Sequence, residues 1–506
     1  MIYINNMKKN TLPALLATSL LLSACGAVMP LPYTQTETQE RVVRDRQQMY
    51  SDQEPLSGPI TFHEAAARAL KYNLDYRLKL LENALSRNLL DVSSHEMLPR
   101  LVASAGRVGR NNDSGGTSYS IETGLETLSP STSQERYRDL RNLGLSWSVL
   151  DFGVSYYRSQ QKADQILMAE ERRRKVAQNV LQDVRNAYWR ALGAQRLIGE
   201  VDDLLDRVRR ALKSARAAED RGLLPRQQAL AYQRALLDAV NILTLRRQDL
   251  ELARSELAAL MTVPPGTRIV LADKEEQAMP RPPASVEALE LMALERRPEI
   301  MEEWYRKRVT EADIKVAKVQ LWPNVGVEIA SSYDSNQFLY NNSWVDYGFH
   351  VSLNLLRLLQ LPSLNDAQAN QNRVDDMRRL ALSMAILTQV RVGNQRYNLA
   401  LSELQFADES MRVDGRLLDY AKAAARTSVD SELEVIRAEA RWLLARYQRY
   451  AAYSNAQMAW GQLYNSVGLD VLPDKIASHD VKTLATEIER TMNSWQETAF
   501  AASDAN

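Results

Sequence analysis

Residues Tyr347 to Leu356, YGFHVSLNLL, alternate between apolar and polar side chains, although much of the rest of the chain repeats with a helical period. The apolar residues are Tyr347, Phe349, Val351, Leu353 and Leu355. Because successive side chains of a strand point to opposite faces, the alternation predicts a strand with one apolar and one polar face. A strand of this kind can stand between hydrocarbon and water.

Composition limits the classes of protein that the chain can represent. It has 506 residues, 25% of them charged, with a formal net charge of zero, whereas a nucleic-acid binder needs a basic surplus. Its 19 glycines and 17 prolines are few for this length and favour long helices. Beyond the N-terminus no run of about 20 apolar residues offers a spanning helix, so any membrane crossing has to use another element.

The N-terminus is predicted to be an export signal, residues 1–24. Lys8 and Lys9 precede an apolar segment that is too short to span a bilayer, and the segment ends at Cys25, the only cysteine. Leu22 to Cys25 resembles the lipobox of bacterial lipoproteins, and Gly26 resembles the next residue of those sorted to the outer membrane. We therefore expect lipidation of Cys25 and an extended segment over residues 25–59; a buried or incidental cysteine is the alternative.

The chain contains two copies of one plan, residues 60–261 and 285–468. Each copy opens with a capped helix that a proline ends, at Pro99 or Pro323. A pair of strands, a helix of about 60 residues, a turn and a returning helix follow. The strand pairs are expected at about 100–109 and 142–150 in the first copy, and at about 324–332 and 346–355 in the second.

From Ala177 onward, apolar residues recur at spacings of three and four along a heptad seam. They are Val180, Val184, Ala187, Ala191, Ala194, Ile198, Val201, Leu205, Val208, Leu212 and Ala215. The pattern predicts a mainly α protein with a small β part, in which long coiled-coil helices pack side by side. The charged run Glu170 to Lys175 is interpreted as a solvated helix face.

Four strands cannot close around a lumen, since about eight are needed for the smallest barrels. An unpaired strand edge in hydrocarbon costs several kcal/mol for each unsatisfied backbone group. The strands therefore predict a transmembrane β-barrel shared between protomers; a soluble amphipathic sheet packed on helices is the alternative. The side chains expected to face lipid are Tyr347, Phe349, Val351, Leu353, Leu143, Leu145 and Trp147.

The order of these elements, with ALKYN, ALERRPEI and SWSVLDFG at their places in it, resembles the outer-membrane efflux (TolC-like) family over about Ile60 to Asp470. The resemblance implies a homotrimer whose 12-stranded barrel in outer-membrane lipid continues into a periplasmic helical barrel. It also implies a periplasmic adaptor protein and an inner-membrane transporter as partners. Residues 262–284 and 469–506 are expected in a mixed belt around the middle of the tunnel.

The resemblance further implies that acidic side chains at the turn of the second copy close the periplasmic tip. Glu434 matches that position best, and Asp430 and Glu432 lie nearby. The alternative is that these are solvated carboxylates at a helix N-terminus, which the helix dipole favours. The first copy has Gly222 at its tip, as the family commonly does, whereas the second has Thr427 and Ser428.

No enzyme or cofactor is expected. The four histidines are scattered without the spacing of metal ligands or of a catalytic triad. No phosphate-binding loop is present, so the energy for transport has to come from a partner. A passive exit duct is the leading hypothesis, and a periplasmic coiled-coil lipoprotein with a tethering role and no channel is the second. Exporters of drugs, metals, proteins and polysaccharide would share all these features.

Overall fold

The computed structural model describes residues 31–126, 129–221, 225–273, 278–281, 285–426, 431–472 and 478–501. The chain divides into two compact units, Met1–Gln53 and Glu54–Asn506. The predicted signal peptide and Cys25 lie outside the described residues.

The first unit contains helix α2 (Gln35–Tyr50), so the expected extended segment is wrong for these 16 residues. Thr34 and Glu37 form a capping box, in which the Glu37 N–H donates to the Thr34 hydroxyl and the Thr34 N–H donates to the Glu37 carboxylate. None of the helix residues is buried. The capping box at Thr34 and Glu37 was a local indication of this helix in the sequence.

The second unit consists of the two expected copies. In each, two short helices lead into a strand pair, a very long helix and a returning helix. The first copy has α3 (Phe62–Tyr72), α4 (Leu74–His95), β1 (Arg100–Gly109), β2 (Tyr137–Ser148), α5 (Val149–Asp220) and α6 (Arg226–Leu260). The second has α7 (Val286–Arg296), α8 (Pro298–Val319), β3 (Asn324–Asp334), β4 (Ser343–Ser352), the 3-10 helix η1 (Leu355–Gln360), α9 (Leu361–Ala425) and α10 (Ser431–Val467), and α11 (Val481–Ala501) follows.

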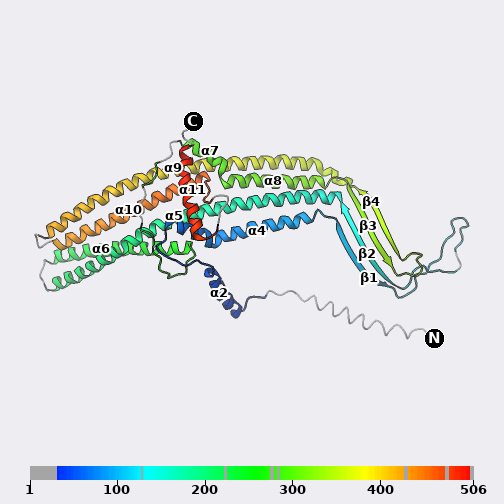
Figure 1. Ribbon diagram of the computed structural model, residues 1–506, viewed down its shortest axis with the longest axis horizontal. Coiled ribbons are helices and arrows are strands. Elements are labelled where there is room, and N and C mark those ends of the chain that lie inside the picture. Colours follow the sequence, from blue (N-terminus) through cyan, green and yellow to red (C-terminus); the bar gives the residue numbers. More distant parts are fainter. Residues whose placement is uncertain are drawn as a thin grey trace. The chain divides into compact units, whose positions relative to one another are not determined.

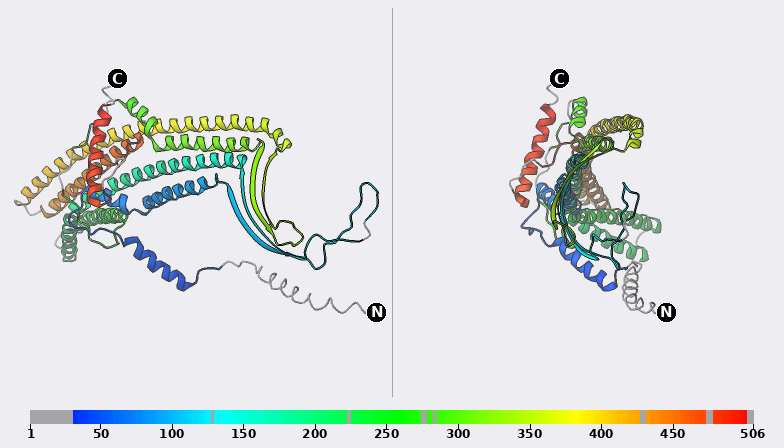
Figure 2. Two further views of the ribbon diagram at one scale, coloured as in Figure 1. Left: turned by 45° about the vertical axis from the view of Figure 1, so that its right-hand side comes forward. Right: turned by 90° about the vertical axis from the view of Figure 1, so that its right-hand side faces the viewer.

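The helices of the second unit form two adjoining sets (Figure 1). The set next to the four-stranded sheet consists, in order, of α4, α5, α8 and α9. The set farther from the sheet consists of α6, α5, α10 and α9, so the long helices α5 and α9 run through both sets. Helix α11 runs across the long helices where the two sets meet (Figure 2). This arrangement confirms the predicted mainly α fold with a small β part.

The long helices exceed the expected length. Helix α5 has 72 residues and α9 has 65, which at 1.5 Å per residue corresponds to about 108 and 98 Å. Helix α5 begins directly after β2, because the Ser148 hydroxyl accepts a hydrogen bond from the Asp151 N–H and caps it. Strand β4 ends at Ser352, three residues before its expected end, because the chain turns into η1 at Leu355.

Two clusters of buried residues form the core. The heptad seam of α5 enters both, and Val184, Ala194 and Val208 are fully buried along it. One cluster joins α3, α5, α7, α9, α10 and α11 where the two sets of helices meet. The other joins α5, α6 and α10 toward the tip.

A matched joint breaks the helix pair in each copy. Asn73 separates α3 from α4 and Arg297 separates α7 from α8, with similar backbone angles of φ −58°, ψ 125° and φ −66°, ψ 130°. The Asn73 side chain caps α4 by accepting the Tyr76 N–H, and Pro298 opens α8. The Arg297 backbone also lies against Gly468, which follows α10 and has a φ of +82°.

We expect Gly468→Ala to lower the thermal midpoint of the protein, measured by circular dichroism, by several degrees. An added Cβ would lie 2.8 Å from the Arg297 backbone N and Cα, and the positive φ disfavours any other residue, so the cost is about 2–4 kcal/mol. Gly199→Ala is the control, because a Cβ there meets nothing within 4 Å and alanine favours the helix. Equal midpoints for the two variants would contradict the close approach.

The Arg297 joint is held by an ion-pair network. The Glu299 carboxylate accepts hydrogen bonds from Arg297 at 2.8 and 3.1 Å and lies 2.9 Å from Lys175 Nζ. Burial alone raises the pKa of Glu299, but the hydrogen bond from Arg297 and the charges of Lys175 and Arg297 outweigh it and lower the pKa to about 2. The ionised carboxylate therefore stabilises the folded state.

Because the folded-state pKa of Glu299 lies below its unfolded value, the stabilisation is complete above about pH 4.5 and is lost as pH falls toward 2. Glu299→Gln is expected to lower the free energy of unfolding by about 2 kcal/mol at pH 7 and to match the wild type near pH 2. Urea unfolding of both proteins across this range measures the difference. A difference that does not change with pH would show that the carboxylate charge is not the cause.

Candidate channel wall

The pairing register of the sheet sorts the side chains of all four strands onto two faces. The strand order is β1-β2-β3-β4, with antiparallel neighbours. Leu101, Leu145, Ile329 and Tyr347 form one row across the sheet. Directly paired residues of an antiparallel sheet share a face, and every pair here joins two odd-numbered or two even-numbered residues. Odd-numbered residues therefore occupy one face and even-numbered residues the other.

Apart from Ser331, the odd-numbered face is apolar over four successive rows, and most of these side chains are exposed. Its rows cover roughly 20 Å along the strands. No charged residue interrupts them. The rows are Val325 with Val351; Trp147, Val327 and Phe349; Leu101, Leu145, Ile329 and Tyr347; and Ala103, Leu143, Ser331 and Val345.

Six of the seven residues expected to face lipid lie on this face, and all of them are exposed, with Tyr347 at 85% and Phe349 at 79%. Leu353 is also exposed but follows the end of β4, because the alternating pattern continues past the sheet. Contact of these side chains with lipid stays a prediction.

Charged groups of the apolar face occur only beyond these four rows, at the end of the sheet away from the helices. Arg107 donates two hydrogen bonds to Asp139, at 2.7 and 2.9 Å. The Arg141 guanidinium lies 5.5 Å from the centre of the Tyr333 ring. This end of the apolar face therefore has the paired charges and the aromatic ring that suit a membrane–water boundary.

The even-numbered face carries a chain of hydrogen bonds across β2, β3 and β4. Asn142 donates to the Ser332 hydroxyl at 3.1 Å, and Ser332 donates to Asp346 at 2.9 Å. The indole N–H of Trp344 also donates to the Asp346 carboxylate, at 2.9 Å to each oxygen. Trp344 lies before the expected start of this strand at 346; the continued alternation of Val345 and Tyr347 could have extended the prediction.

Both edges of the sheet are open in the described chain, since β1 and β4 each pair with one neighbour only. The marginal helices are also apolar on their outer sides. Exposed residues at three-, four- and seven-residue steps form a stripe on α4 and another on α9. They are Leu74, Leu78, Leu81, Leu85, Leu89 and Val92 on α4, and Leu399, Phe406, Val413 and Tyr420 on α9.

Within the second unit, Glu434 lies near the start of α10, at the end opposite to the sheet. Its side chain is 62% exposed and accepts a hydrogen bond from Arg437 at 2.7 Å. Asp430, Gly222, Thr427 and Ser428 lie outside the described residues, as does the side chain of Glu432. The gate role of Glu434, Asp430 and Glu432 stays a prediction.

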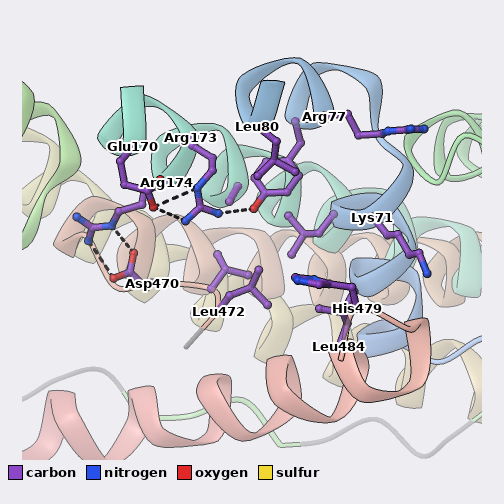
Figure 3. Close-up of a pocket in the computed structure, with 14 residues that line it drawn as sticks. Lys71, Arg77, Leu80, Glu170, Arg173, Arg174, Asp470, Leu472, His479 and Leu484 are labelled. Carbon is purple, nitrogen blue, oxygen red and sulfur yellow. Dashed lines mark hydrogen bonds and ion pairs between the residues drawn. The ribbon is translucent and has the colours of Figure 1, made fainter. Parts of the chain in front are cut away.

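A cleft of about 610 Å³ lies between α4, α5 and α11 (Figure 3). Arg173 donates to Glu170 and to the Tyr76 hydroxyl, and Arg174 donates to Asp470, as Figure 3 shows. The hydrogen bond to Glu170 raises the pKa of Arg173 despite burial. The interpretation of Glu170 to Lys175 as a solvated face is therefore wrong, because these charges join α5 to other elements.

No three histidine, cysteine, aspartate or glutamate side chains of the described residues are grouped so that they could hold a metal ion. Among the helices that the structure describes, none is both long and apolar enough to cross a membrane.

The model of the family described as "Outer membrane efflux protein" matches residues 67–262 and 291–469, one segment in each copy. These segments make up well over half of the chain, which therefore belongs to the outer membrane efflux protein family. No curated protein matches the sequence significantly.

Solved structures of outer-membrane proteins share the fold, two of them outer-membrane channels. The CmeC outer membrane channel of Campylobacter jejuni has a TM-score of 0.63 at 13% identity, covering 87% of this chain and 94% of that one. The open state of the MtrE outer membrane channel of Neisseria gonorrhoeae has a TM-score of 0.62 at 16% identity, covering 80% and 88%. The outer membrane protein VceC of Vibrio cholerae has 0.59 at 13%, covering 80% and 96%.

Proposed function

We propose that the protein is a passive, trimeric exit duct in the outer membrane. It would release substrate delivered by an inner-membrane transporter and a periplasmic adaptor, as part of a tripartite efflux or type I secretion system. One observation carries the proposal: the sheet has an apolar face, a polar face and two open edges.

Closure of the sheet requires sister chains. In hydrocarbon the outer edges of β1 and β4 would leave backbone groups unsatisfied unless another strand pairs with them. Three copies supply twelve strands, with the odd-numbered face toward lipid and the even-numbered face toward water. The apolar stripes of α4 and α9 lie at the two margins of each chain, where neighbouring copies would cover them.

The tethering alternative accounts for the long helices but not for the sheet. A tether in water would expose four rows of apolar side chains, including Tyr347 and Phe349, without a function for them. Family membership adds support for the channel.

We expect Phe349→Asp to abolish assembly of the detergent-stable trimer, measured by size-exclusion chromatography with light scattering and by conductance in planar bilayers. Phe349 stands within the apolar band, where each carboxylate costs roughly 1–3 kcal/mol, and a trimer carries three of them. Phe349→Ala separates the charge from loss of the ring and should still assemble.

Ser104→Asp is the matched control, because residue 104 lies on the opposite face, is exposed and is paired with the uncharged Asn142. If all three variants assembled, the prediction that the odd-numbered face contacts lipid would be wrong. A wild-type protein recovered as a soluble monomer from membrane-free extract would end the channel proposal.

Lipid anchoring at Cys25 belongs to the same proposal and rests on the lipobox-like Leu22 to Cys25. The intact mass of the purified protein is expected to correspond to a chain beginning at an acylated Cys25. Cys25→Ser is expected to lose the acyl mass while keeping the strands that insert. An unmodified wild-type thiol would contradict the anchor and leave the channel proposal standing.

A further inference from the structure

The even-numbered face of the sheet carries six ionisable side chains among the described residues: Arg100, Arg138, Glu328, Asp334, Asp346 and His350. With histidine neutral, three carboxylates face two arginines. Each chain therefore contributes one net negative charge to this wall.

The charges at the two ends of the strands offset each other. Arg138 and Asp334 form an ion pair at 2.8 Å at the end away from the helices. Near the helices, Arg100 and Glu328 stand in one row across β1, β2 and β3, with Ser146 between them. Two strand spacings, about 10 Å, separate the backbones of that row, so the two opposite charges cancel at one depth.

Asp346 stands alone between these pairs. It is paired with Ala330, one row further along the strands than Glu328, and it is exposed. No arginine or lysine of the described residues forms an ion pair with it. Its carboxylate is nevertheless fixed, because Trp344 and Ser332 donate hydrogen bonds to it at 2.9 Å. Such charge-assisted bonds hold a carboxylate in place against the wall.

We propose that Asp346 gives the channel a preference for cations, by placing one fixed and uncompensated carboxylate of each protomer at the same depth of the lumen. This inference rests on the proposed function, because only a closed assembly brings three copies around one axis. A ring of like charges raises the local concentration of cations and lowers that of anions. The class of solute favoured at this depth is the small cation or the cationic end of a larger substrate.

The test measures the cation-to-anion permeability ratio of the full-length trimer in planar bilayers, from the reversal potential in a potassium chloride gradient at pH 8. The wild type is expected to prefer potassium, and Asp346→Asn should lower the ratio by about twofold. In 1 M salt the difference should shrink, because the screening length falls to about 3 Å. Asp139→Asn is the control: it removes a strand carboxylate from the opposite face and should leave the ratio unchanged.

A cysteine variant tests charge without relying on one substitution. The natural chain has a single cysteine, Cys25, so Asp346→Cys places one addressable thiol on the wall. A negatively charged methanethiosulfonate reagent should restore the cation preference, and a positively charged reagent should reverse it. Wild-type protein treated with the same reagents shows whether Cys25 contributes.

The outcomes separate the inference from the function on which it rests. A wild type that forms no conducting trimer would overturn both. A conducting wild type without cation preference, or one whose ratio Asp346→Asn leaves unchanged, would overturn the role of Asp346 alone. The latter result is also expected if Arg100 of a neighbouring copy neutralised Asp346 across the β4–β1 edge.

Discussion

Register is the constraint on which this structure depends. Each of the three strand pairings joins residues of equal parity, so four separate alternating patterns add up to one apolar and one polar face. A slip of one residue in any pairing would bring the polar set of that strand onto the apolar face. The bonds on the polar face, from Asn142 through Ser332 to Asp346, tie β2, β3 and β4 together in the observed register.

The helices, unlike the strands, stabilise the fold by burying apolar side chains. The strands make few buried contacts, whereas the heptad seam of α5 enters both buried clusters, and α3, α7 and α11 pack where the two sets of helices meet. The network around Arg297 and the charges of α5 that join Tyr76, Glu299 and Asp470 lie in the same region. Most of the buried residues that the structure describes are therefore remote from the sheet.

The sequence was sufficient for the parts of the fold that repeat. Alternation identified the strands, although β2 begins at Tyr137 and not near 142. The spacing of three and four identified α5, and Pro99 and Pro323 marked helix ends. The sequence was insufficient where the alternating pattern continues past the end of a strand. Leu353 and Leu355 continue the pattern, but β4 has ended at Ser352 and the backbone turns toward α9. The pairing of Glu299 with Lys175 and of Arg174 with Asp470 joins residues more than one hundred positions apart, which periodicity within one segment does not reveal. Trp344 lies two residues before the expected start of its strand, so its hydrogen bonds to Asp346 were not predicted either.

The two copies differ in how strand passes into helix, and this difference has a mechanical consequence. In the first copy Ser148 ends β2 and Val149 begins α5, with no residue between them. In the second, Leu353, Asn354 and the six residues of η1 separate β4 from α9. A rotation of α5 about its own axis would act on β2 directly, because no residue lies between them. The same rotation of α9 would first wind or unwind the short 3-10 helix η1, so it would reach β4 less directly.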